Sequence, residues 1–413
     1  MKRLNASLLL MCGISFSLFS QQPVSISMGA GYANDLYYSL PGGLIKSEPA
    51  QNWHLAFTVR PIDASIMINE SAGVKAYLAS NNANDWSTLD TTGMHAQELH
   101  NSSADWALGA FANLGVNHPD YGWGEYNQIT HNVNGTRIFV IELADGSFRK
   151  FFVEEMGASN QTFTFRLANL DGSNEITRSA IKTDYAGKNF FYYNLLDDQF
   201  LDREPLSSTW DLIARRYDIE IPAGPMVFHY IVSGIQSNLG VQSAEVRGAM
   251  VSAADSVNYT LSDEDISTIG SDWKSFDNAT FTWSIVDSLS YFVSSRSGGV
   301  YHLTFTGFGG SGNGQIDFTQ SPAQSIGVDE PMATAWLPYP NPVIDRVRVP
   351  LGGMNGAVVL RLSDLHGRLV KEVQTIAEGN DFLELDLSTL PTGTYQVELQ
   401  HGSERFNSRI LIR

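Results

Sequence analysis

Apolar and polar residues alternate regularly along the C-terminal part of the chain. Apolar side chains recur at every second position in three segments, which are Val358–Leu362, Leu383–Leu387 and Tyr395–Leu399. A period of two is typical of strands with one buried face. Short turns that contain glycine separate these segments, as at Pro391-Thr392-Gly393. The pattern predicts a small β-sandwich over residues 336–413.

A larger segment, residues 21–320, is rich in aromatic residues, threonine, valine and glycine and has little helical periodicity. Turn residues at 145–146, 171–172 and 297–299 predict hairpins. The segment is long enough for one large β unit or two smaller ones. Residues 321–335 lack an apolar period and carry two prolines, so we interpret them as a linker. The chain is therefore predicted to be all-β, with a large antiparallel body before the small sandwich.

One pattern occurs twice in the body. A tyrosine-rich strand at Asp35–Leu40 leads through a polar turn to a tryptophan-led strand at Trp53–Arg60. Later, Phe191–Leu195 leads in the same way to Trp210–Tyr217. Two interpretations remain open. One β unit is used twice, or the two segments share a pattern that is common among β-proteins.

The N-terminus has the order of a signal peptide. Lys2 and Arg3 precede an apolar run that ends near Ser20, and polar residues follow. We expect cleavage after residue 20 and no transmembrane segment in the mature chain. The only cysteine, Cys12, lies inside this segment, so the mature protein is expected to lack disulfides and thiolate sites.

Negative charge is concentrated in the body. The chain carries 26 Lys and Arg against 44 Asp and Glu, a net charge of −18. The segment from Trp336 onward is nearly balanced, so almost the whole excess falls in residues 21–320. An acidic body repels polyanions, which excludes nucleic acid as an expected partner.

Ordered motifs in the last segment resemble a known family. Tyr-Pro-Asn-Pro, a hairpin with Asp-x-x-Gly, Leu-Pro-x-Gly-x-Tyr and a basic terminal strand are similar to the C-terminal sorting domain of type IX secretion cargo in Bacteroidetes. The resemblance implies an immunoglobulin-like sandwich that the outer-membrane translocon and its sorting peptidase recognise. It further implies export through the periplasm to the cell surface or the medium. The alternative is an accessory immunoglobulin-like domain without a sorting role. The sorting motif residues are expected to be Pro340, Asn341, Pro342, Gly367 and Gly393.

The body carries a second resemblance. Trp210-Asp-Leu-x-x-x-Arg-Tyr217, the Ala-Asp-Gly-Ser-Phe hairpin and a late Tyr-x-Leu-x-Phe-Thr-Gly-Phe strand resemble the HmuY-like family of secreted Bacteroidetes proteins over residues 30–320. The family is named for a haem-capturing member. The matched motifs are structural strands and do not include haem ligands, so haem binding does not follow from them.

Haem is nevertheless the ligand that the family resemblance suggests. It needs an axial side chain on each face of the iron and an apolar slot. We name three histidines of one polar, aromatic-rich stretch as candidates: His95, His118 and His131. The alternative is that they are solvated loop residues, whereas His229 and His302, next to tyrosines in strands, are expected to be packing residues. A glycan platform on Trp106 and Trp123 is a further possibility.

Catalytic motifs are not found in the sequence. It has neither a Gly-x-Ser-x-Gly elbow nor a His-Glu-x-x-His zinc helix. The sequence therefore favours a secreted or surface-anchored binding protein that is not an enzyme, with haem as a possible ligand. The alternative is a structural or adhesive surface protein that binds glycan or host protein.

Overall fold

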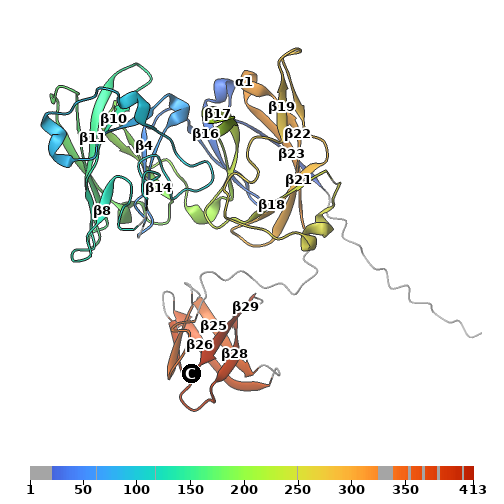
Figure 1. The fold of residues 1–413 in the computed structure, drawn as a ribbon. Helices are drawn as coiled ribbons and strands as arrows, with labels where there is room; N and C mark the ends of the chain where they lie inside the picture. The colour runs from blue at the N-terminus through green and yellow to red at the C-terminus, as the bar shows by residue number, and fades with distance from the viewer. Residues whose placement is uncertain are drawn as a thin grey trace, which may run out of the picture. The chain divides into compact units, whose positions relative to one another are not determined.

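A computed structural model describes residues 21–61, 63–116, 118–248, 250–323, 338–351, 355–364, 368–378, 382–401 and 404–413. The predicted signal peptide and Gly367 lie outside the described residues. The chain divides into two compact units, the body ending at Gln324 and a C-terminal unit beginning at Ser325 (Figure 1). Antiparallel strands dominate both units and the described helices are short, which confirms the all-β prediction.

The body contains two β-sandwiches. The first, which we call the central sandwich, is drawn in blue, cyan and green in Figure 1 and carries the labels β4, β8, β10, β11 and β14. Its 4-stranded sheet has the order β15 (Gln199–Leu201), β14 (Phe190–Asn194), β4 (Leu55–Thr58), β5 (Ile66–Ile68). Its 8-stranded sheet has the order β13 (Ile176–Ile181), β12 (Thr162–Ala168), β11 (Phe148–Gly157), β10 (Ile138–Glu142), β6 (Lys75–Ser80), β7 (Glu98–Leu99). In addition, β9 (Val133–Gly135) pairs with β11, and β8 (Gly124–Tyr126) pairs with β9. Buried phenylalanines from both sheets form its core, and Phe57 stacks on Phe191.

The second sandwich, which we call the flanking sandwich, combines the N-terminal strands with the last strands of the body. Its 4-stranded sheet has the order β17 (Met226–Ser237), β16 (Leu212–Ala223), β2 (Asn34–Ser39), β3 (Gly43–Pro49). Its 5-stranded sheet has the order β1 (Gln22–Ser27), β23 (Gln315–Pro322), β22 (Val300–Phe308), β21 (Leu289–Ser294), β18 (Ser243–Arg247). A separate hairpin pairs β19 (Lys274–Asp277) with β20 (Thr282–Ile285).

Short helical turns connect the strands of the body. They are η1 (Ala30–Tyr32), η2 (Glu70–Ala72), η3 (Ala83–Ser87), η4 (Met94–Gln97), η5 (Lys182–Tyr185), η6 (Ser207–Thr209), η7 (Ala253–Asn258) and α1 (Gly310–Asn313). The three hairpins predicted from turn residues are all present. Gly146 and Gly172 adopt φ values of 78° and 85°, a region that glycine enters without steric cost.

The two sandwiches repeat one arrangement of strands. The order β15-β14-β4-β5 in one 4-stranded sheet corresponds to β3-β2-β16-β17 in the other. The remaining common strands correspond in the same way, β13-β12-β11-β10-β6 to β1-β23-β22-β21-β18. The register of the β11–β12 pair shifts between Val153 and Glu155, and that of the β22–β23 pair shifts at the corresponding place, between Phe305 and Gly307. The pattern that occurs twice in the sequence therefore marks a duplicated β unit.

The duplicated units exchange strands. In the register, Tyr38 faces Leu212 and Tyr193 faces Leu55, so the tyrosine strand of each copy pairs with the tryptophan strand of the other. The ring pairs Tyr37–Trp210 and Trp53–Tyr192 have the same geometry, with centroids 5.1 Å apart at 77°. Each sandwich thus needs both copies of the sequence, which explains why the body forms one compact unit.

Equivalent side chains close equivalent turns in the two copies. The carboxylate of Asp211 accepts a hydrogen bond from the backbone N–H of Leu40 at 2.7 Å. His54 occupies the corresponding position and accepts from the N–H of Leu195 through Nδ1 at 3.0 Å. Buried Asn69 and Asn238 likewise each donate to the carbonyl of the nearby tryptophan, Trp53 or Trp210. These polar groups satisfy backbone atoms where water is excluded.

The C-terminal unit is a separate β-sandwich. One sheet pairs β24 (Arg346–Pro350) with β27 (Phe382–Asp386), and the other has the order β26 (Leu369–Glu378), β25 (Asn355–Asp364), β28 (Gly393–His401), β29 (Glu404–Ile412). The alternating residues seen in the sequence form its core, for example Leu360, Leu385 and Val397. The unit therefore has a hydrophobic core of its own.

Candidate functional site

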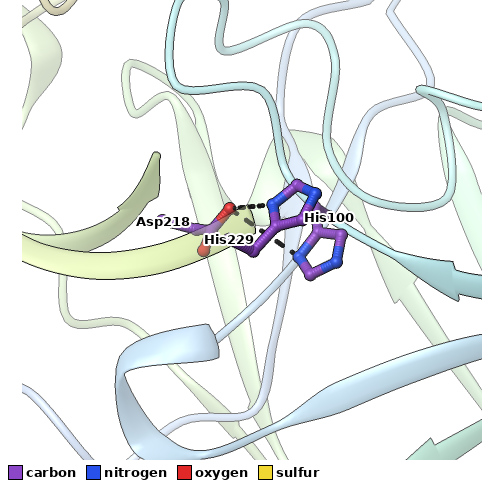
Figure 2. A group of neighbouring side chains, drawn as sticks. All are labelled: His100, Asp218 and His229. Carbon is purple, nitrogen blue, oxygen red and sulfur yellow. Dashed lines mark hydrogen bonds and ion pairs between the residues drawn. The ribbon is translucent and has the colours of Figure 1, made fainter. Parts of the chain in front are cut away.

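Four polar side chains meet where β16 and β17 reach the central sandwich. Asp218 lies on β16 and His229 on β17, whereas His100 follows β7 and Glu70 begins η2. Figure 2 shows the two imidazole rings lying one over the other, with the Asp218 carboxylate facing both. Segments far apart in the sequence thus supply the cluster.

One carboxylate oxygen connects the two histidines. Asp218 Oδ2 lies 2.5 Å from Nδ1 of His229 and 3.7 Å from Nδ1 of His100. The two rings are stacked, with centroids 3.3 Å apart and planes inclined by 5°. Among the described residues, His100, Asp218 and His229 form a group whose possible ligand atoms all lie within 4.8 Å of one another.

Glu70 adds a second carboxylate, held by Asn101. Glu70 Oε1 lies 3.0 Å from Nδ1 of His100, and Oε2 accepts a hydrogen bond from the Asn101 amide at 2.7 Å. The same amide also donates to the carbonyl of Ile68 at 2.8 Å, which fixes its orientation. Only 8% of the Glu70 side chain is exposed. Asn101 therefore positions a nearly buried carboxylate toward the histidines.

The carboxylates and His100 influence one another's protonation. Burial raises the pKa of Glu70 above its usual value, although the hydrogen bond with His100 opposes this. Burial likewise raises the pKa of Asp218, against the effect of His229. Burial alone lowers the pKa of His100, but the hydrogen bond with Glu70 and the surrounding carboxylates raise it overall. The cluster consequently holds protons to a higher pH than isolated groups would.

The cluster lines a cleft of about 390 Å³. Its apolar lining residues include Val74, Leu99 and Phe228. Glu98 adds a further acidic side chain to the lining, and Lys75 adds a cationic one. Apolar walls with a few convergent polar groups are typical of binding sites for small ligands or ions.

The β16–β17 hairpin places Asp218 and His229 on the same face. Glu220 pairs directly with His229, so Asp218 is its diagonal neighbour two residues away. This relation follows from the turn at Gly224, whose φ is 64°. The turn in Ala223-Gly224-Pro225 is the sequence signal that would have revealed the Asp218–His229 pair.

The prediction that His229 is a packing residue is wrong. Its side chain is 27% exposed and bonds to Asp218, because the hairpin extends beyond the sheet that would cover it. His302 is buried against Phe292, as expected. No sequence signal indicated Glu70 or its contact with His100, because that contact depends on how the segments pack.

The three histidines named as haem candidates lie in two places. His95 is exposed and packs edge-on against Tyr77, with centroids 4.9 Å apart. His118 and His131 both lie beside Tyr126, and the Tyr126 hydroxyl is 2.5 Å from Nδ1 of His131. The structure therefore groups His118 with His131 and separates His95 from them. Haem binding by these residues stays a prediction.

The glycan platform suggested for Trp106 and Trp123 is wrong. Their exposed fractions are 4% and 0%, so neither ring is available to a sugar. Each indole N–H donates to a buried carbonyl, that of Ser237 for Trp106 and that of Ala64 for Trp123. Both side chains belong to the cores.

The described sorting residues, Pro340, Asn341, Pro342 and Gly393, lie next to the terminal strand β29. Asn341 donates through Nδ2 to the carbonyl of Arg409 at 3.0 Å and accepts from the N–H of Leu411 through Oδ1 at 2.9 Å. Pro340 and Pro342 flank it. Gly393 is the first residue of β28, directly after the Pro391-Thr392 turn. The side chain of Asn341 thus holds the terminal strand β29 in place through two hydrogen bonds.

Comparison with known proteins matches the C-terminal unit to a family model. Residues 338–413 match the family model of the secretion system C-terminal sorting domain. No curated protein matches the chain. Among solved structures, dimeric latent PorU from Porphyromonas gingivalis aligns at 9% identity and a TM-score of 0.17. The alignment covers 68% of this chain and 32% of that one, and its TM-score is too low to bear on the fold.

The matched domain implies export by the type IX secretion system to the cell surface or the extracellular space. Handling by the type IX machinery, including its sorting peptidase, follows from the same match. Among the described residues, no helix is long and apolar enough to cross a membrane.

Proposed function

We propose that this protein is a binding protein delivered outside the cell by its sorting domain. The signal peptide directs the chain to the periplasm, the outer-membrane translocon recognises the C-terminal unit, and the body binds its ligand after export. The observation that carries the proposal is the match of residues 338–413 to the sorting domain. The cleft beside His100 and His229 supports the binding role, because it combines apolar walls with a charged cluster.

The resemblance of residues 30–320 to the HmuY-like family is part of this proposal. Its Trp210–Tyr217 motif belongs to the exchanged strands, where Trp210 packs against Tyr37. The motif therefore serves the scaffold, and the ligand is decided by residues outside it. Assignment as a binding protein and not as an enzyme rests on the absence of catalytic motifs from the sequence.

Deletion of residues 338–413 should retain the body in the periplasm. The measurement is protease accessibility on intact cells of the source bacterium, together with detection of the body in the medium. A matched pair of substitutions tests whether the folded domain is the signal. Leu399→Asp places a charge at a position that is 0% exposed and should block export, whereas Ile376→Asp, at 70% exposure, should not. Unchanged surface delivery after the deletion would refute the proposal.

Asn341→Ala should loosen the terminal strand of the sorting domain. The substitution removes the hydrogen bonds to Arg409 and Leu411, each worth about 0.5–1.5 kcal/mol. We expect the free energy of unfolding of the C-terminal unit to fall by about 1–3 kcal/mol and less of the protein to reach the surface. Hydrogen exchange of the β29 amides measures the loosening. Ile376→Ala, on the exposed face, is the control, and equal protection in both variants would contradict the prediction.

A further inference from the structure

Two members of the His100–Asp218–His229 cluster, Asp218 and His229, lie on an addition to the duplicated scaffold. In the first copy the corresponding strands are short, with β4 ending at Thr58 and β5 beginning at Ile66. In the second copy the strands are longer, because β16 continues to Ala223 and β17 begins at Met226. Asp218 and His229 lie on this extra length, outside the part that the two copies share. The duplicated scaffold therefore does not explain why these two polar side chains are present.

The extended hairpin also meets residues that are already oriented. His100 Nδ1 lies 3.7 Å from Asp218 Oδ2 and 3.0 Å from Glu70 Oε1. Asn101 holds Glu70 in this position. Both imidazoles present Nδ1 to the same carboxylate oxygen. Two imidazole nitrogens and carboxylate oxygens thus converge on one small volume at the edge of an open cleft.

These atoms are the ligands of a particular class of cation. Imidazole nitrogen suits zinc, copper, iron and nickel, whereas calcium and magnesium prefer oxygen alone. Zinc–ligand bonds of about 2.0–2.2 Å place tetrahedral ligand atoms about 3.3–3.6 Å apart. The observed spacings, from 2.5 Å up to 4.8 Å, bracket this value. His229 can adjust because it is partly exposed on the hairpin.

We propose that His100, Asp218 and His229 bind one divalent first-row transition metal ion, with Glu70 as an additional carboxylate ligand. The inference rests on the proposed binding role of the body and names the class of ligand that this cleft takes. Asn101 is a positioning residue, since it contacts Glu70 and not the metal. Glu98 and Asp218 make the cleft acidic, which favours a cation over an anion.

Metal binding is tested on the purified mature chain after treatment with a chelator. Isothermal titration with Zn²⁺ should give one site per chain, and titration with Ca²⁺ or Mg²⁺ should give none. His229→Gln and Asp218→Asn should each weaken Zn²⁺ binding at least about a hundredfold. Asn101→Ala should weaken it by about 10–100-fold, the usual effect of removing a group that orients a ligand.

The matched control is His95→Gln, which removes an exposed histidine elsewhere in the body and should leave Zn²⁺ affinity unchanged. Near-ultraviolet circular dichroism shows whether each variant is folded. Weak or absent Zn²⁺ binding by the folded wild-type chain would overturn the inference, as would full binding by His229→Gln or equal binding of Ca²⁺.

None of these outcomes affects surface delivery, so the metal inference and the export proposal can be tested and refuted separately. Normal surface delivery of His229→Gln confirms that separation.

Discussion

Replacing Asp211 by alanine should lower the free energy of unfolding of the body by about 3–5 kcal/mol. This buried carboxylate accepts hydrogen bonds from the backbone N–H of Leu40 at 2.7 Å and of Arg296 at 2.6 Å. The hydroxyl of Ser295 donates to it as well. Alanine would leave these donors without a partner where water cannot reach, at about 1–3 kcal/mol for each buried group.

The duplicated scaffold supplies a comparison for this variant. His54 is the counterpart of Asp211 but accepts a single backbone hydrogen bond, from Leu195. His54→Ala should therefore cost less, about 1–3 kcal/mol. Asp171→Ala, at an exposed Asp-Gly turn, should cost less than about 1 kcal/mol. Urea unfolding followed by tryptophan fluorescence measures all three. The same small loss for Asp211→Ala and Asp171→Ala would contradict the prediction.

Replacing Arg203 by methionine should destabilise the body by a similar amount, about 3–5 kcal/mol. Its guanidinium is 3.0 Å from Asp35 Oδ2 and also donates to the carbonyl of Pro49. The exposed side-chain fractions of Arg203 and Asp35 are 3% and 4%, so the pair is desolvated. Arg203→Met would leave the Asp35 carboxylate buried without a counter-charge. Burial raises the pKa of Glu204 to about 7, and the charge of Arg203 acts in the opposite direction. Arg203→Met would remove that opposing charge.

The controls for Arg203→Met separate charge burial from loss of packing. Arg247 forms exposed ion pairs with Glu245 and Asp272, so Arg247→Met should cost at most about 1 kcal/mol. Combining Arg203→Met with Asp35→Asn should recover part of the loss, because the uncompensated carboxylate is then absent. Thermal and urea unfolding of the four variants measure these differences. A double variant as unstable as the sum of its single substitutions would show that the two side chains do not interact.

Asp35 and Arg203 also show why the exchange of strands matters. Asp35 lies on β2 of the first copy and Arg203 lies just after β15 of the second. The exchanged tyrosine strands bring the two residues together, so their ion pair joins one copy to the other. We expect that cutting the chain between the copies would not yield two folded halves, because each sandwich lacks strands without its partner.

Local patterns in the sequence predicted the elements well. The alternation of apolar and polar residues predicted the strands of the C-terminal sandwich, because a period of two shows which residues face a core. Asp-Gly turns gave the β10–β11 and β12–β13 hairpins for the same local reason. The paired motifs around Trp53 and Trp210 pointed to a repeat. They could not show that the repeats exchange strands, because pairing partners far apart in the chain leave no local signal.

The candidate site was the least predictable part. The sequence drew attention to histidines between His95 and His131 because they are concentrated in one stretch. From that stretch the structure brings His100, which is not among the three named candidates, next to His229, and no pattern of neighbouring residues encodes that contact. Asp218 and His229 come together through a hairpin register, whereas Glu70 and His100 join them through packing of one sandwich beside the other.

The sequence by itself determined the all-β class and the sorting domain, because both depend on residues that are neighbours along the chain or within one hairpin. It also determined that the acidic charge lies in the body. Only the tertiary structure decided which strands pair across the duplicated units and which four polar side chains meet at the edge of the cleft. Those outcomes depend on contacts between distant segments, such as the buried ring pairs Tyr37–Trp210 and Trp53–Tyr192, which leave no local signal in the sequence.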